Sequence, residues 1–139
     1  MSSEGPLHDY LLLSRGHWDA DLSPVEIQKV IDEFYVWYER LLGEGKFKPG
    51  QRLAREGKTV HERKVTDGPF TESKEIIGGY WFIVARSLEE AAAIAAQSPC
   101  LACGLYYEIR PIDLSRPKAD DVTCETPAER RAVSRARSR

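Results

Sequence analysis

The amino-acid sequence predicts an α+β domain in which two helices cover one face of a mostly antiparallel sheet. Three observations favour this class: the order of the expected elements, two strong helix-start signals, and one strand that is apolar on both faces. The chain has 139 residues, of which 42% are hydrophobic and 30% charged. This size and composition are typical of a single globular domain with one core.

The first half of the chain predicts a strand and a long helix. Residues 9–14 (DYLLLS) form a short apolar run that is typical of a strand. Ser23-Pro24-Val25-Glu26 is a capping box with proline at the first helical position, which predicts a helix start. Apolar side chains then recur at helical spacing, and glycines at 43 and 45 predict the helix end. The apolar positions are Ile27, Val30, Ile31, Phe34, Trp37, Tyr38, Leu41 and Leu42.

The middle of the chain predicts a hairpin and a turn. Residues 51–55 and 59–64 are polar on both faces, and Glu56-Gly57-Lys58 between them has turn composition. We therefore expect a hairpin there, at an edge of the sheet or under a loop. Thr66-Asp67-Gly68-Pro69 predicts a second turn, and Gly78-Gly79 predicts a bulge at the start of the next strand.

The second half predicts a strand, a helix and a last strand. Residues 79–86 are the most apolar segment of the chain. Ser87-Leu88-Glu89-Glu90 is a second capping box, which opens an alanine-rich helix that we expect to reach residue 97. Residues 105–112 complete the pattern as a final strand.

This order of elements predicts a ferredoxin-like fold. Residues 80–84 (YWFIV) are apolar on both faces of their strand, although two helices cover only one face of a sheet. A second copy of the same sheet is the simplest cover for the other face. We therefore expect a homodimer whose two antiparallel sheets face each other, as in a dimeric α+β barrel.

The charge of the chain is unevenly distributed. The formal net charge is −2, but residues 129–139 carry +4, so residues 1–128 carry −6. A mildly acidic domain does not favour a nucleic-acid-binding function. We divide the chain into an N-terminal tail (1–8), a domain (9–114) and a basic C-terminal tail (115–139), in which Thr126-Pro127-Ala128-Glu129 could begin a short helix.

Three cysteines in a chain without a signal peptide do not indicate a disulfide framework. Cys100-Leu101-Ala102-Cys103 has CxxC spacing, but it follows a helix end, where the helix dipole does not favour a thiolate. A zinc site would need two more ligands near it. We expect no metal and no organic cofactor. No apolar run is long enough to span a membrane, and we expect a cytoplasmic protein.

Three residues are candidates for acid/base catalysis. Asp67 precedes the most apolar strand, where partial burial could raise a carboxyl pKa towards neutrality. The alternative is that Asp67 only stabilises the turn. His17 and His61 are the candidate partners, because an imidazole beside a carboxylate is held in one tautomer and made more basic. The alternative for each is a surface histidine without a chemical role.

Four residues are candidates for substrate binding. Glu108 and Arg110 share one face of the last strand, where Arg110 could bind an acidic group through two hydrogen bonds from its guanidinium group. The alternatives are a cross-strand ion pair or a contact between subunits. Trp18 could form one wall of a pocket beside His17. Tyr80 belongs to an aromatic set that either holds an aromatic ligand or is part of the core.

The stretch VTDGPFTESKE at residues 65–75, followed by Gly78-Gly79-Tyr80, resembles the signature of DGPF-domain proteins in the YCII-related family. The similarity covers residues 10–112 and includes SLEEA at 87–91 and EIRP at 108–111. The resemblance implies a ferredoxin-like dimeric α+β barrel. It also implies a histidine–aspartate pair, for which Asp67 matches the aspartate. The family's histidine belongs to the first helix, but residues 23–43 of this chain contain none.

Three functional hypotheses follow. The first is a cofactor-independent acid/base enzyme for a small anionic or aromatic metabolite, since some relatives resemble lactone dehydrohalogenases of aromatic degradation. The second is an accessory or regulatory protein linked to a sigma factor of the extracytoplasmic-function class, because DGPF-type relatives are often encoded beside such factors. The third is a small-ligand binding module.

Overall fold

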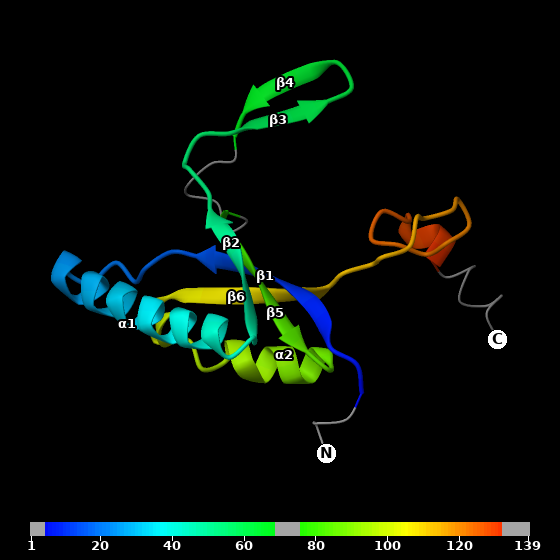
Figure 1. The fold of residues 1–139 in the computed structure, drawn as a ribbon. Helices are drawn as coiled ribbons and strands as arrows, with labels where there is room; N and C mark the ends of the chain where they lie inside the picture. Colours follow the sequence, from blue (N-terminus) through cyan, green and yellow to red (C-terminus); the bar gives the residue numbers. More distant parts are fainter. Residues whose placement is uncertain (1–4, 69–75, 132–139) are drawn as a thin grey trace.

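The computed structural model describes residues 5–68 and 76–131 (Figure 1). Its elements follow the predicted order of strand, long helix, hairpin, strand, helix and strand, with one further strand and one short 3₁₀ helix. In chain order they are β1 (His8–Gly16), α1 (Pro24–Gly43), β2 (Phe47–Arg52), β3 (Lys58–His61), β4 (Lys64–Asp67), β5 (Ile77–Ala85), α2 (Leu88–Ala95), η1 (Pro99–Cys103) and β6 (Leu105–Pro111).

The main sheet has four strands in the order β2-β5-β1-β6, and every pair of neighbours is antiparallel. The helices α1 and α2 both contribute to the single core cluster on one face of this sheet. The α+β class with an antiparallel sheet is therefore confirmed. β3 and β4 form a separate two-stranded sheet that projects away from the main one (Figure 1).

Local signals begin both helices where the sequence predicts. The Ser23 hydroxyl accepts a hydrogen bond from the Glu26 amide at 3.1 Å, and the Glu26 carboxylate accepts one from the Ser23 amide at 2.9 Å. The Ser87 hydroxyl likewise accepts from the Glu90 amide at 3.0 Å. A cap of this kind stabilises a helix by about 1 kcal/mol. Gly45 follows the end of α1 with φ of 74°. Glycine adopts this left-handed conformation without strain, which is why it commonly ends a helix.

The two faces of the main sheet have different surroundings. Alternate residues of β1 and β5, such as Leu12 and Ile83, are completely buried under the helices. Trp81 lies on the same face, with its ring centre 5.5 Å from that of Phe34 in α1. The residues between them are half-buried and lie on the opposite face, which no helix of the described chain covers. We call this the open face, and its apolar members are Leu11, Leu13, Tyr80, Phe82 and Val84.

The predicted hairpin of residues 51–55 and 59–64 is wrong. β2 instead covers residues 47–52 and pairs with β5 at the edge of the main sheet. Phe47 explains the difference, because it is buried against Trp37 and Tyr38 of α1 and draws this otherwise polar segment into the core. The hairpin of the structure joins β3 to β4 through residues 62 and 63.

The predicted turn at 66–69 is also displaced. Thr66 and Asp67 lie in strand β4, where they pair with Thr59 and Lys58. The residues of the DGPF stretch from 69 to 75 lie outside the described part of the chain.

A β-bulge in β2 changes which face its last residues occupy. Phe47 and Lys48 pair with Ile83 and Phe82, but Gln51 and Arg52 pair with Tyr80 and Gly79, so β2 contains one extra residue. A one-residue slip moves every following side chain to the other face of a sheet. Arg52 therefore lies on the helix-covered face, opposite Gly79.

Gly50 makes this bulge possible. A Cβ atom at Gly50 would lie 1.8 Å from the backbone oxygen of Tyr80, which leaves room only for glycine. A second register shift, between Ser14 and Arg15 of β1, leaves one extra residue in β5 at Gly78. The predicted bulge at Gly78-Gly79 is thus confirmed.

After β6 the chain leaves the sheet as an extended segment (Figure 1). Residues 128–131 form a helical turn, and residues 132–139 lie outside the described part. Within the described residues, we find no helix with the length and apolar character needed to cross a membrane.

Candidate functional site

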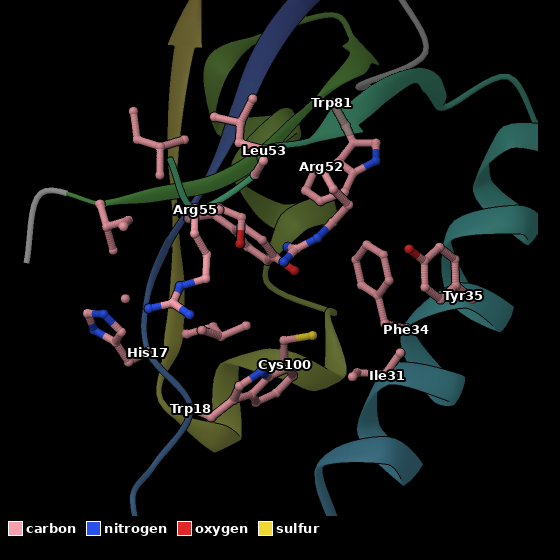
Figure 2. A pocket seen from close by; sticks show the side chains of 18 residues that line it. His17, Trp18, Ile31, Phe34, Tyr35, Arg52, Leu53, Arg55, Trp81 and Cys100 are labelled. Carbon is pink, nitrogen blue, oxygen red and sulfur yellow. The ribbon is translucent and has the colours of Figure 1, made fainter. Parts of the chain in front are cut away.

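A cavity of about 510 Å³ lies at one end of the main sheet (Figure 2). β1 and β2 end there, β5 and β6 begin there, and α1 and η1 close the sides. The volume is in the range of small-molecule sites. The lining residues are Ser14, Gly16, His17, Trp18, Ile31, Phe34, Tyr35, Arg52, Leu53, Ala54, Arg55, Ile76, Ile77, Gly78, Trp81, Cys100, Leu105 and Tyr107.

The loop after β1 is held against η1. The Asp19 amide donates a hydrogen bond to the Cys103 carbonyl at 2.8 Å. Gly104, with φ of 104°, allows this approach, because a Cβ atom there would lie 2.4 Å from the His17 carbonyl oxygen. This close contact places the side chains of His17 and Trp18 at the cavity.

Aromatic side chains form the walls of the cavity. Phe34 and Trp81 are both buried, and they contact each other as tilted rings. Trp18 is half-buried and lies on the side of the cavity formed by the loop after β1 (Figure 2). Flat apolar surfaces of this kind favour a ligand with an apolar or aromatic body.

Hydroxyl and thiol groups lie at the β6 and η1 side. The hydroxyls of Ser98 and Tyr107 are 2.7 Å apart, and the Ser98 hydroxyl also accepts from the Cys100 amide at 3.2 Å. Burial raises the pKa of the Tyr107 hydroxyl and that of the Cys100 thiol above their ordinary values. Both groups are therefore neutral at neutral pH and act as hydrogen-bonding groups, not as anions.

Two arginines supply the positive charge of the cavity. The guanidinium groups of Arg52 and Arg55 both point into it (Figure 2). No aspartate or glutamate is among the lining residues that the structure describes. Within the same described chain, neither arginine has a carboxylate within salt-bridge distance.

Comparison with known protein families matches residues 10–114 to the YCII-related domain. The chain belongs to the YCII-related family. The resemblance read from the sequence is thereby confirmed. No curated protein matches the chain.

Of the predicted site residues of this YCII-related domain, the structure brings two together at the cavity. His17 and Trp18 both line it, His17 exposed and Trp18 half-buried. The roles of His17 in proton transfer and of Trp18 in substrate binding stay predictions.

The structure does not bring Asp67 and His61 to the cavity. Both lie on the projecting hairpin, and the side chain of Asp67 is 84% exposed and paired with Lys58. His61 is exposed beside the hairpin turn. The Asp67 side chain thus lies in solvent and not in the partly buried place that the sequence-based hypothesis required. The catalytic roles of Asp67 and His61 stay predictions, without support from the cavity geometry.

Glu108, Arg110 and Tyr80 lie on the open face of the sheet, away from the cavity. Arg15 donates to the Glu108 carboxylate at 2.5 Å and Arg110 donates to it at 3.2 Å. Arg110 also donates to the Cys124 sulfur at 2.8 Å. The hydrogen bond from Arg15, with the support of Arg110, lowers the pKa of Glu108. The contact between Arg15 and Glu108 is a cross-strand ion pair, while the roles of Glu108, Arg110 and Tyr80 in substrate binding stay predictions.

Sequence reasoning did not predict several polar lining residues of the YCII-related domain, among them Arg52, Arg55, Cys100 and Tyr107. Arg52 and Arg55 were assigned to the predicted hairpin. The signal that could have identified Arg52 is Gly50, since a glycine inside a strand often marks a bulge.

The cysteines and acidic residues give no metal centre. All three cysteines are free, and Cys100 and Cys103 are three positions apart in η1. In the part of the chain that the structure describes, no three histidine, cysteine, aspartate or glutamate residues lie close enough to hold a metal ion.

Proposed function

We propose that this YCII-related protein binds a small molecule in the cavity between α1 and the end of the sheet. The observation that carries the proposal is the cavity itself, which combines aromatic walls with hydroxyl and guanidinium groups in a volume of about 510 Å³. A site with few polar groups on a mostly apolar surface orients a ligand while it removes most of the ligand from water.

A second candidate function is acid/base catalysis on the bound molecule without a cofactor. One observation favours it: His17 lies at the cavity, and its imidazole is the group whose ordinary pKa is closest to neutrality. His17 would exchange a proton with the ligand, while the neutral Tyr107 hydroxyl, itself hydrogen-bonded to Ser98, would orient it.

Native mass spectrometry tests ligand binding directly. We expect protein purified gently from its own cells to retain a small molecule. The larger side chain of Ile31→Trp should obstruct the cavity and abolish the extra mass, because Ile31 lines it from α1. Val36→Trp is the matched control, since Val36 lies on the same helix and is 72% exposed. An extra mass that persists in Ile31→Trp would contradict the site, and an empty protein would favour the alternative of a regulator linked to a sigma factor.

Catalysis is tested by incubation of the protein with a metabolite extract of the same cells, followed by mass spectrometry. The enzyme hypothesis expects one compound to be consumed by the wild type and left unchanged by His17→Asn, while the variant still retains the bound molecule. Equal consumption by both proteins would exclude His17 as the acid/base group.

We also propose that the domain is ferredoxin-like and forms a homodimer, in which two open faces meet as a dimeric α+β barrel. The strand order and the helices on one face support the fold. The apolar open face, with Tyr80 and Phe82 in edge-to-face contact at its centre, supports the assembly. At one margin of the open face, Lys48 and Asp9 form an ion pair at 3.0 Å, so these two side chains add polar groups but no net charge.

A further inference from the structure

We propose that the cavity selects a small molecule with one anionic group on a flat apolar body, and that Arg52 and Arg55 bind the anion. The inference rests on the proposed binding function and specifies its ligand class. A carboxylate and a phosphate share the chemistry, since both accept paired hydrogen bonds from a guanidinium group.

The first support is the charge balance of the cavity. Arg15, Arg40 and Arg110 each have a carboxylate within 4.0 Å. Arg52 and Arg55 have none among the residues that the structure describes, and both are directed at the cavity (Figure 2). Two neighbouring cations without a protein counter-charge attract an anion from solution.

The second support is the backbone that delivers Arg52. Without the bulge, the pairing of Phe47 with Ile83 would place Arg52 opposite Gly78, one position along β5 and on the open face. The extra residue moves Arg52 to the helix-covered face and directs its guanidinium group into the cavity. A bulge interrupts the hydrogen-bonded ladder, and bulges near binding sites commonly re-aim a side chain. Gly50 allows this bulge to form, because any Cβ atom at that position would collide with the backbone of Tyr80.

The third support is the rest of the lining. The cavity has no carboxylate among its described residues that would repel an anion. Trp18, Phe34 and Trp81 provide apolar surface for a flat body. The Tyr107 hydroxyl, which lines the cavity and is hydrogen-bonded to Ser98 behind it, is neutral and can bind a polar, uncharged substituent on that body.

Isothermal titration calorimetry with three naphthalene probes tests the inference. The probes are 2-naphthoate, 2-naphthyl phosphate and the neutral 2-naphthalenemethanol, each titrated into the full chain. Because a charge-assisted pair contributes an order of magnitude or more to binding, we expect one or both anions to bind at least about ten-fold more tightly than the alcohol. The anion with the lower Kd identifies the source as a carboxylate or a phosphate.

Variants assign the preference to residues. Arg52→Gln and Arg55→Gln should each weaken anion binding by about ten-fold and leave the alcohol unchanged. Arg52→Lys should lose part of the preference, because lysine keeps the charge but not the planar fork. Arg40→Gln is the matched control, since Arg40 is exposed on α1 and should change nothing. Circular dichroism melting curves check that each variant is folded.

Each result either supports or overturns the inference. Equal binding of the alcohol and the anions would overturn it while the proposed binding function stands. An anion preference that survives in folded Arg52→Gln and Arg55→Gln would also overturn it. If no probe binds but native mass spectrometry finds a retained neutral molecule, the anion inference fails and the proposed binding function stands. If no probe binds and no molecule is retained, both proposals fail.

Discussion

Two pairs of arginines lie at the main sheet, and their surroundings differ. On the open face, Arg15 and Arg110 both donate to Glu108, so each guanidinium group has a carboxylate partner in the protein. Arg52 on the helix-covered face and Arg55 in the loop after β2 lie at a cavity without a carboxylate among the described residues. Paired surface charges suit a contact with another protein, whereas unpaired charges in a partly enclosed site are available to a ligand.

The apolar residues of β5 also differ between the two faces of the sheet. Trp81 and Ile83 are buried under the helices, while their neighbours Tyr80 and Phe82 are half-buried on the open face of the single chain. The covered face thus contributes to the stability of one chain, and we infer that the open face contributes to its assembly. Substitutions on alternate residues of one strand can separate these two contributions.

The largest expected effect is on the covered face. Ile83→Ala should lower the free energy of unfolding by about 2–5 kcal/mol, because Ile83 is fully buried and its truncation leaves a cavity. Urea denaturation measures this value. Val84→Ala, on the open face of the same strand, is the control and should cost about 1 kcal/mol at low protein concentration. Equal losses for the two variants would contradict the distinction between the faces.

Disruption of the proposed dimer is the next largest effect. Phe82→Asp should halve the mass measured by light scattering, since a carboxylate buried between two sheets costs several kcal/mol. The monomer should remain folded, because Phe82 lies outside the core cluster. Val60→Asp, on the projecting hairpin and 73% exposed in the wild type, should leave the mass unchanged. A wild-type protein with the mass of one chain would rule out the facing sheets.

Removal of the bulge should have a smaller effect on stability but a direct effect on the cavity. Gly50→Ala introduces a Cβ atom that collides with the backbone of Tyr80, and we expect a loss of about 1–3 kcal/mol. Binding of the anionic naphthalene probe should weaken as well, because Arg52 follows the bulge. In Gly43→Ala, at the end of α1, the new Cβ atom meets nothing within 4 Å, so stability should not fall and anion binding should not change. Unchanged anion binding by folded Gly50→Ala would show that Arg52 does not need the bulge to reach the cavity.

The smallest expected effect concerns Glu108. Its pKa lies below the ordinary value chiefly because of the hydrogen bond from Arg15, so Arg15→Gln should raise it more than Arg110→Gln does. A lowered carboxyl pKa stabilises the folded protein above the unfolded value of about 4.3. That stabilisation is lost as the pH falls through the lower folded value. Carboxyl ¹³C shifts in an NMR titration would measure both variants, and a larger rise in Arg110→Gln would contradict the assignment.

Much of the fold could be predicted from the sequence because its signals are local. The capping box at Ser23 and the serine cap at Ser87 fix both helix starts, and the pattern of β5, apolar on both faces, predicts that each face is covered. β2 could not be predicted in this way. The place of β2 in the sheet depends on Phe47, its one buried aromatic residue, which packs against α1. A contact between separate elements of this kind is not visible in the local sequence pattern.

The candidate site was only partly accessible to the same reasoning. His17 and Trp18 could be placed near the sheet end because they follow a strand directly. Arg52 was not placed there, since its face depends on a one-residue slip that polar periodicity does not reveal and that Gly50 alone signals. Asp67 was selected for its place before an apolar strand, but three-dimensional pairing puts it on an exposed hairpin.

The indole signals of the three tryptophans offer the most direct test of the central claim, that the helix-covered face holds an anion-binding cavity. Trp18 and Trp81 line this cavity, whereas Trp37 is buried in the core outside its lining. In a ¹⁵N–¹H NMR titration with 2-naphthoate, two indole signals should shift and that of Trp37 should not, and Arg52→Gln should weaken the shifts. A probe that moves no cavity indole, or that moves the open-face amides of Leu11 and Phe82 instead, would contradict the account.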